Sequence, residues 1–416
     1  MKKHLVDRRK SLALFLVVFV LYSLIYMTKN CYSAAMASIV NENIMTKTET
    51  GLIAAAFYLV YAPFQIVGGF AADKFSPYKL ILIGMAGAGV CNMLVYFLHD
   101  NYIAMLVIWS LNAAIQFGIW PSVFKITVAE LAPEHRTRGV YFMMMTPTVG
   151  LAASYVTAAF IDKWQNNFLF SGVVLFSLVL IFFFFYRGVS RSMVADANPT
   201  DKGKKTVQTK SGKELLLLIV KSGIPLLLIV YTVQGIMNIG LKSLVPVMLL
   251  ESYESVTPEI ANMLNIIIIV LTPIGMFIGG LPFFKRFSYP GTIAILFGVS
   301  VPLAFLLTFI GSANIVVIIA ALTVIVCAMS AMSAYFSYCS KTFEKFGMGG
   351  ALSGIFNCMS ALGMVLSNYV FMGIAEDYGW GVTTKVWFSV VIGAFILAAV
   401  SVGIWKRFCE KHINND

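Results

Sequence analysis

The chain has 416 residues, of which 59% are hydrophobic and 12% are charged, and its mean hydropathy is +0.85. A water-facing globular domain carries roughly a quarter of charged residues, so this composition excludes a soluble globule and indicates a protein whose surface faces lipid. The net charge of +11 leaves a nucleic-acid-binding surface to be considered, and the distribution of the charges along the chain decides that question.

Twelve apolar stretches follow one another along the chain, separated by short polar breaks that contain turn residues. One crossing of the hydrocarbon core takes about 20 apolar residues, so each stretch predicts a membrane-spanning helix. The stretches cover residues 12–38, 49–71, 80–98, 102–127, 139–161, 167–186, 222–250, 260–283, 291–310, 313–340, 349–373 and 383–405. The predicted fold is therefore an all-α membrane protein with 12 transmembrane helices in two pseudo-symmetric six-helix bundles.

Lysine and arginine residues lie almost entirely on one side of this predicted topology. If both termini face the cytoplasm, 23 of the 30 lie in cytoplasmic segments and three in the opposite loops, namely Lys47, Lys163 and Lys385. Cytoplasmic loops of membrane proteins carry the excess of positive charge, so both termini are predicted to be cytoplasmic in a multi-pass protein of the cell (plasma) membrane. Topology thereby explains the positive charge, and no nucleic-acid partner is expected.

The middle of the chain is polar and basic. Residues 190–213 contain almost no large apolar side chain, which is typical of a flexible linker. The predicted organisation is an N-terminal six-helix half over 1–189, a cytoplasmic linker over 190–213 and a C-terminal six-helix half over 214–416. The halves resemble each other, because the sequence Gly68–Lys74 after the second span is echoed 211 residues later by Gly279–Lys285. This repetition indicates a duplication, a plan common among transporters.

The loop after the second span carries a distinctive motif. The pattern Gly69-x-x-x-Asp73-Lys74-x-Ser76-x-x-Lys79 resembles the cytoplasmic loop motif of the major facilitator superfamily. The resemblance implies that Gly69 lets two helices approach closely, and that the charged residues of the motif hold helix ends in one conformation during transport. The alternative interpretation is a generic charged turn that anchors two helices at the cytoplasmic face.

A finer resemblance is to the organophosphate:phosphate antiporters, which carry glycerol phosphate or hexose phosphates. It rests on three stretches, which are Tyr26-Met27-Thr28-Lys29 through Ala35-Met36, Gly118 to Lys125 with Trp120-Pro121, and Gln234 to Gly240 through Pro246. The resemblance places Lys29 at the position of a phosphate-binding arginine. Asn238 departs from the family pattern, because it stands where the family has its second phosphate-binding arginine, and Pro147 stands where glycerol-phosphate carriers have a binding histidine. A lysine and an amide do not reproduce the bidentate guanidinium fork.

Four lysines fall inside the predicted spans, namely Lys29, Lys125, Lys221 and Lys242, whereas the acids lie at helix ends. A buried cation costs about 3 kcal/mol, so it faces a cavity, finds a partner or loses its proton. Lys221 opens the seventh span and is expected to extend to the cytoplasmic interface. For Lys125 and Lys242, lining a cavity and reaching the headgroups are both open interpretations.

Polar side chains recur at helical spacing beside two of these lysines. One stripe consists of Tyr22, Tyr26, Lys29 and Ser33 in the first span, and the other of Tyr231, Gln234, Asn238 and Lys242 in the seventh. The predicted substrate-binding residues are Tyr22, Tyr26, Lys29, Trp120, Lys125, Gln234, Asn238, Lys242 and Asn357. For Asn357 the alternative is a hydrogen bond between helices, and for Trp120 it is ordinary packing.

Unpaired cations without carboxylates predict an electropositive cavity, for which a small anionic solute supplies the missing charge. Proton symporters of the superfamily use a membrane-embedded acid, so anion exchange or uniport by a functional monomer is expected instead. One alternative is a multidrug or amphiphile exporter, which the 21 Met and 33 Phe would suit, and a second is a non-transporting sensor with a transporter fold. No nucleophile–base set, metal cluster or phosphate loop indicates an enzyme, and no cofactor or metal is expected.

Overall fold

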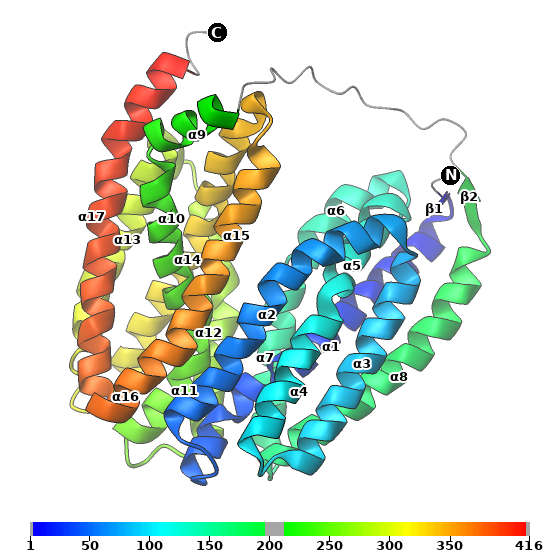
Figure 1. Ribbon diagram of the computed structural model, residues 1–416, viewed down its shortest axis with the longest axis horizontal. Coiled ribbons are helices and arrows are strands. Elements are labelled where there is room, and N and C mark those ends of the chain that lie inside the picture. Colours follow the sequence, from blue (N-terminus) through cyan, green and yellow to red (C-terminus); the bar gives the residue numbers. More distant parts are fainter. Residues whose placement is uncertain (1–2, 196–211, 413–416) are drawn as a thin grey trace. The chain divides into compact units, whose positions relative to one another are not determined.

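The computed structural model describes residues 3–195 and 212–412 (Figure 1). Within these ranges the chain is almost entirely helical, so the predicted all-α class is confirmed. It forms two compact units, the first comprising Met1–Lys202 with Thr257–Ile266 and the second comprising Gly203–Val256 with Ile267–Asp416.

The helices of the first unit are α1 (Arg8–Asn41), α2 (Lys47–Lys74), α3 (Pro77–Leu98), α4 (Tyr102–Ile115), the 3₁₀ turn η1 (Gln116–Gly118), α5 (Ile119–Ala129), α6 (Pro133–Met143), α7 (Thr146–Phe160) and α8 (Trp164–Ser190). Helix α1 packs against α7 and α8, and α3 contacts both α4 and α8. The buried core includes Leu14, Val18 and Leu21 of α1 together with Val123 and Phe182. Burial of such side chains away from water and lipid headgroups fixes the packing of this unit.

The helices of the second unit begin with α9 (Gly212–Lys221), α10 (Ile224–Gly235), the π-helical segment η2 (Ile236–Gly240) and α11 (Leu241–Ser252). They continue with α12 (Pro258–Gly279), whose start belongs to the first unit, η3 (Phe284–Arg286), α13 (Tyr289–Leu307), α14 (Ile315–Thr342) and η4 (Phe343–Phe346). The last are α15 (Gly349–Leu366), the π-helical η5 (Ser367–Phe371), α16 (Met372–Tyr378) and α17 (Trp380–His412). Helix α13 packs against α14 and α17, and α10 packs against α15 and α17.

Ten helical stretches in the described ranges are long and apolar enough to cross a membrane, and the chain is a multi-pass membrane protein. The predicted spans at 49–71 and 139–161 correspond to α2 and to the pair α6 and α7, which are not among the ten. The fifth predicted span is broken because Pro147 has no N–H for the Met143 carbonyl one turn earlier. The Thr146 hydroxyl donates to that carbonyl instead, at 2.6 Å.

A second proline shapes the fourth predicted span. Pro121 cannot donate to the Phe117 carbonyl, and the 3₁₀ turn η1 lies at this point between α4 and α5. A Cβ added to Gly68 of α2 would collide with that Phe117 carbonyl, whereas a Cβ added to Gly69 would meet nothing within 4 Å. In this structure Gly68 is therefore the residue at which α2 touches the turn before α5, and the close approach implied for Gly69 stays a prediction.

The start of the predicted linker is ordered against the N-terminal segment. Strand β1 (Lys3–Leu5) pairs in antiparallel register with β2 (Met193–Ala195), so that His4 lies opposite Val194. The backbone N–H of Leu5 also donates to the Glu130 carbonyl at 2.9 Å. The remainder of the predicted linker lies outside the described residues.

Candidate functional site

Lys29 lies in the middle of α1 with its side chain 7% exposed. Its ammonium group sits 3.6 Å from the centroid of the Tyr61 ring, 4.8 Å from that of Tyr26 and 5.5 Å from that of Phe57. Among the described residues it has no ion pair and no hydrogen bond. Electron-rich ring faces attract a cation without neutralising it. Lys29 is therefore a buried lysine whose terminal amine lies among three aromatic side chains, which we call the aromatic cage (Tyr26, Phe57 and Tyr61).

The other predicted aromatic residues of this unit lie beside the aromatic cage. The Tyr22 ring stacks on Trp120 with centroids 5.1 Å apart and an interplanar angle of 28°, and it meets Tyr26 edge to face at 5.5 Å. Pro121 and the 3₁₀ turn η1 set the start of α5, which carries Trp120. The structure thus brings together Tyr22, Tyr26, Lys29 and Trp120, and their role in substrate binding stays a prediction.

Helix α2 contributes residues that the sequence reasoning missed. Phe57 and Tyr61 belong to the aromatic cage, and Gln65 follows one further turn along the same face at spacing i, i+4, i+8. The side-chain Nε2 of Gln65 is buried and has no hydrogen-bond partner among the described residues. An unpaired buried amide donor costs about 1–3 kcal/mol, so Gln65 offers a donor to an anionic ligand. The signal available in the sequence was the i, i+4, i+8 spacing within the second predicted span.

Lys125 is placed elsewhere in the first unit. Its ammonium group donates to the backbone carbonyl of Ala72, near the end of α2 and about 16 Å of helix rise beyond Tyr61. Nearby, the half-buried Glu130 accepts a hydrogen bond from the Tyr186 hydroxyl at 2.8 Å. Burial raises the pKa of the Glu130 carboxyl, and the Tyr186 hydrogen bond and the charge of Lys125 oppose that rise. Lys125 therefore belongs to a polar group at the helix ends and not to the aromatic cage.

In the second unit, Lys242 is also 7% exposed. Its ammonium group donates to Asn238 Oδ1 at 2.9 Å, and the Ser330 hydroxyl of α14 lies 3.5 Å from the same oxygen. Asn238 lies within the π-helical segment η2, and such segments are frequent at functional sites. Lys242 therefore has a polar, amide-based environment, in contrast to the aromatic environment of Lys29.

The remaining predicted residues of the second unit differ in their surroundings. Gln234 Nε2 donates to the Met329 carbonyl and to the Ser333 hydroxyl, both at 3.0 Å, so its amide ties α10 to α14. Asn357 is exposed on α15, while Ser360 on the same helix is buried. Gln234 and Asn238 of the seventh predicted span thus contact α14. Asn357 is exposed and does not belong to this group.

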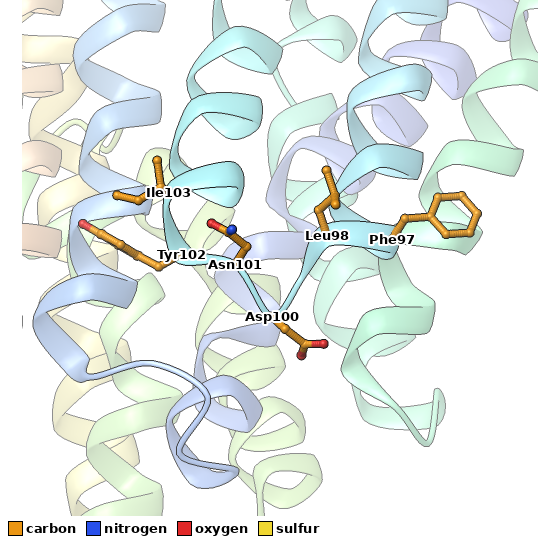
Figure 2. Close-up of a pocket in the computed structure, with 6 residues that line it drawn as sticks. All are labelled: Phe97, Leu98, Asp100, Asn101, Tyr102 and Ile103. Atoms are coloured by element: carbon orange, nitrogen blue, oxygen red, sulfur yellow. The ribbon is translucent and has the colours of Figure 1, made fainter.

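The residues of the loop motif lie at the end of α2 and the start of α3. Lys74 and Lys79 are exposed, and the side chain of Asp73 lies outside the described part of the structure. A hollow at the turn between α3 and α4 is lined by residues in the range Phe97–Ile103. Figure 2 shows Phe97 and Tyr102 pointing to opposite sides of this turn, with Asp100 at its tip. A hollow with a carboxylate at its rim suits no anion, so it is not a substrate site candidate.

Among the described residues, no group of three or more His, Cys, Asp or Glu side chains could hold a metal ion. The first unit holds one buried lysine with its aromatic cage, and Gln65 lies one further turn along α2 with an unpartnered amide donor.

The sequence model of the Major Facilitator Superfamily matches residues 18–368, which is most of the chain. The chain belongs to the Major Facilitator Superfamily. This is a family of transporters and not an enzyme class, and it is the superfamily that the loop motif predicted.

Curated relatives of this superfamily member include a membrane sensor protein and probable transporters. It is 32% identical over 120 residues to the membrane sensor protein UhpC of Salmonella typhimurium, covering 28% of this chain and 27% of the relative. It is 27% identical over 179 residues to the probable sulfoacetate transporter SauU of Cupriavidus necator, covering 41% and 40%. It is 20% identical over 171 residues to a probable hexose phosphate transport protein of Chlamydia pneumoniae, covering 40% and 37%. The chain thus matches between about a quarter and two fifths of these relatives' lengths. The predicted resemblance to the organophosphate:phosphate antiporter family is confirmed.

Solved transporter structures share the fold at low identity. A bacterial homolog of the human lysosomal transporter Spinster, in an inward-facing and unoccupied conformation, matches with a TM-score of 0.75 and 13% identity over 98% of each chain. The nucleoside transporter NupG matches with a TM-score of 0.73 and 15% identity over 94% of this chain and 99% of that chain. At such identities the likeness establishes the transporter fold alone.

Proposed function

We propose that this protein is a secondary transporter that moves a small organic anion across the cell membrane by alternating access, through exchange or uniport. The proposal includes twelve crossings, with α2 and the pair α6 and α7 added to the ten apolar helices, and two halves at 1–189 and 214–416 that carry the transport cycle as a monomer. Lys29 is assigned as the charge partner of the anion, with Tyr22, Tyr26, Tyr61 and Gln65 around it.

The observation that carries this proposal is the environment of Lys29. A lysine at the centre of a membrane helix costs about 3 kcal/mol, and cation–π contacts return about 0.5–2 kcal/mol. Of the three rings in the aromatic cage, that of Tyr61 lies nearest to the ammonium, with its centroid at 3.6 Å. The aromatic cage thus offsets part of the cost, and an anion would supply the full counter-charge that the rings cannot.

The positions of the acids support exchange or uniport over proton coupling. Every acidic residue in the described helices lies in a first or last turn or at a cap, as Glu49, Glu130 and Glu251 do. A carboxyl group that carries a proton through the membrane is expected at the depth of the substrate site. The described helices offer none there, whereas the buried Lys29 suits an anion.

Uptake by purified protein in proteoliposomes tests the proposal. The panel consists of glucose 6-phosphate, glycerol 3-phosphate, sulfoacetate, simple carboxylates and simple sulfonates, with and without an anion inside the vesicles. Saturable uptake of at least one anion supports the proposal, and stimulation by internal anion indicates exchange. Uptake restricted to organic cations or neutral amphiphiles would replace it with the exporter function.

A second candidate function has support from relatives that are named as sensors. The match to the protein named membrane sensor protein UhpC favours a sensor that binds its ligand without transporting it. The two functions separate in the same vesicles, because a sensor should show ligand binding by thermal shift or calorimetry but no uptake. A carrier should show both.

The predicted orientation can be tested by labelling. A labelling position within the predicted linker, such as Ser211, lies outside the described residues, so we choose the exposed Arg191 after α8 and the exposed Ser312 between α13 and α14. With Cys358, the exposed native cysteine, replaced by Ser, Arg191→Cys is expected to react with a membrane-impermeant maleimide only from the cytoplasmic side. Ser312→Cys should react only from outside. The reverse result for the pair would overturn the orientation.

A further inference from the structure

An indole–carboxylate hydrogen bond joins two helices of the first unit at the end far from the N-terminus. Trp164, the first residue of α8, donates its Nε1–H to Glu42 Oε2 at 3.0 Å, and Glu42 is the C-cap of α1. The tryptophan is only 3% exposed, and its ring meets His99 edge to face at 5.5 Å. This bond fixes the end of the helix that carries Lys29 to the last helix of its own half.

The second unit contains the same arrangement in different residues. Trp380, the first residue of α17, donates its Nε1–H to Glu251 Oε2 at 2.8 Å, and Glu251 lies in the last turn of α11. Trp380 is 5% exposed. Here the bond ties the helix that carries Lys242 to the last helix of the second half.

The two bonds occupy equivalent places in an internal repeat. A Cβ on Gly150 of α7 would collide with the Ser23 carbonyl and lie 2.9 Å from the Met27 nitrogen, and a Cβ on Gly363 of α15 would collide with the Thr232 carbonyl and lie 2.9 Å from the Ile236 nitrogen. The equivalent pairs Ser23 and Thr232, Met27 and Ile236, and Glu42 and Glu251 are each 209 positions apart. A shared register across the glycine contact and the indole–carboxylate bond shows that the bond recurs with the fold of each half. In the same register Asn238 takes the place of Lys29.

We propose that Glu42 with Trp164, and Glu251 with Trp380, are positioning residues that fix each lysine-bearing helix to its own half while that half moves during transport. This inference rests on the proposed transport function. Hydrogen bonds to a charged group are stronger than those between neutral groups. An indole at the edge of the membrane can keep its ring in apolar surroundings while its N–H binds a polar partner. Glu42 lies 13 residues beyond Lys29, which is about 20 Å along the helix. The bond therefore acts on the helix and not on the ligand.

The test removes the indole N–H donor and keeps an aromatic ring at the same position. Trp164→Phe and Trp380→Phe delete the indole N–H, whereas Trp387→Phe on α17 is the matched control, since its buried Nε1 has no hydrogen-bond partner among the described residues. Glu42→Leu removes the acceptor, and Glu42→Gln keeps an amide oxygen and should restore the wild-type behaviour. Glu42→Leu also replaces Trp164→Phe if that variant does not fold.

Two readouts are measured on each variant. Spin labels on Asn41→Cys and Lys163→Cys, both exposed in the wild type, report the distance between the ends of α1 and α8. The maximal rate of anion uptake is compared with the apparent affinity for the same anion. In Trp164→Phe we expect a broader distance distribution and a maximal rate that falls about tenfold, the equivalent of 1.4 kcal/mol, with affinity within about threefold. Trp387→Phe should match the wild type in both.

The outcomes separate this inference from the proposed function. A distance distribution in Trp164→Phe equal to that of the wild type would overturn the inference, as would a broader distribution with an unchanged maximal rate. A wild-type protein that transports none of the panel would overturn the transport function and this inference with it, while the distance measurement would still show whether the bond holds the two helices together.

Discussion

Replacing Lys29 by Met is expected to abolish anion uptake in a correctly folded protein. The substitution keeps the length of the side chain and removes its charge, so it separates packing from electrostatics. Deleting one partner of a buried charge pair costs about 2–5 kcal/mol, which is on the order of 30-fold or more in affinity. The apparent affinity for the anion and the rate of uptake in proteoliposomes measure this loss.

Two further variants sharpen the Lys29 experiment. Lys29→Arg keeps the charge and should reduce uptake less than Lys29→Met, and its planar fork should shift preference towards phosphate esters. Lys221→Met removes a lysine that is exposed at the end of α9, and it should leave uptake unchanged. Full anion flux through Lys29→Met would eliminate the anion-site assignment and favour the exporter function.

Replacing Gly150 by Ala is expected to destabilise the first unit strongly. The added Cβ would collide with the Ser23 carbonyl and with Cβ of Tyr26, and it would lie 2.9 Å from the Met27 nitrogen. Two of these atoms belong to the α1 backbone, so the helices must separate. Overpacking of this kind costs about 1–3 kcal/mol or more, and separation would also displace Tyr26 of the aromatic cage. Thermal unfolding in detergent and anion affinity should both fall.

A matched control for Gly150→Ala is available on another helix. A Cβ on Gly393 of α17 would meet nothing within 4 Å. Gly393→Ala should therefore be neutral or raise stability by up to about 1 kcal/mol, because alanine favours the helix over glycine. If Gly150→Ala unfolds at the same temperature as Gly393→Ala, the close contact between α1 and α7 does not limit the stability of this unit.

The amino-acid sequence was sufficient to predict the fold class, the superfamily and the presence of a lysine inside the first span. Continuous apolar stretches can satisfy their backbone groups in lipid only as helices, so composition and length were sufficient for an all-α membrane protein. A lysine in the middle of such a stretch is costly wherever the helix packs, and Lys29 therefore stood out before any contact was known. The stripe with Tyr22 and Tyr26 followed from helical spacing alone.

Which residues from other helices surround that lysine depends on how the helices pack. Phe57 and Tyr61 belong to α2, and nothing local in the sequence shows which face of one helix turns towards another. Packing also explains why Lys125 lies away from the aromatic cage. Its long side chain donates to the backbone carbonyl of Ala72, which only the packing of the helices brings near. The contact at Gly68 instead of Gly69 has the same origin, since neighbouring residues on a helix point about 100° apart and only the partner helix selects between them.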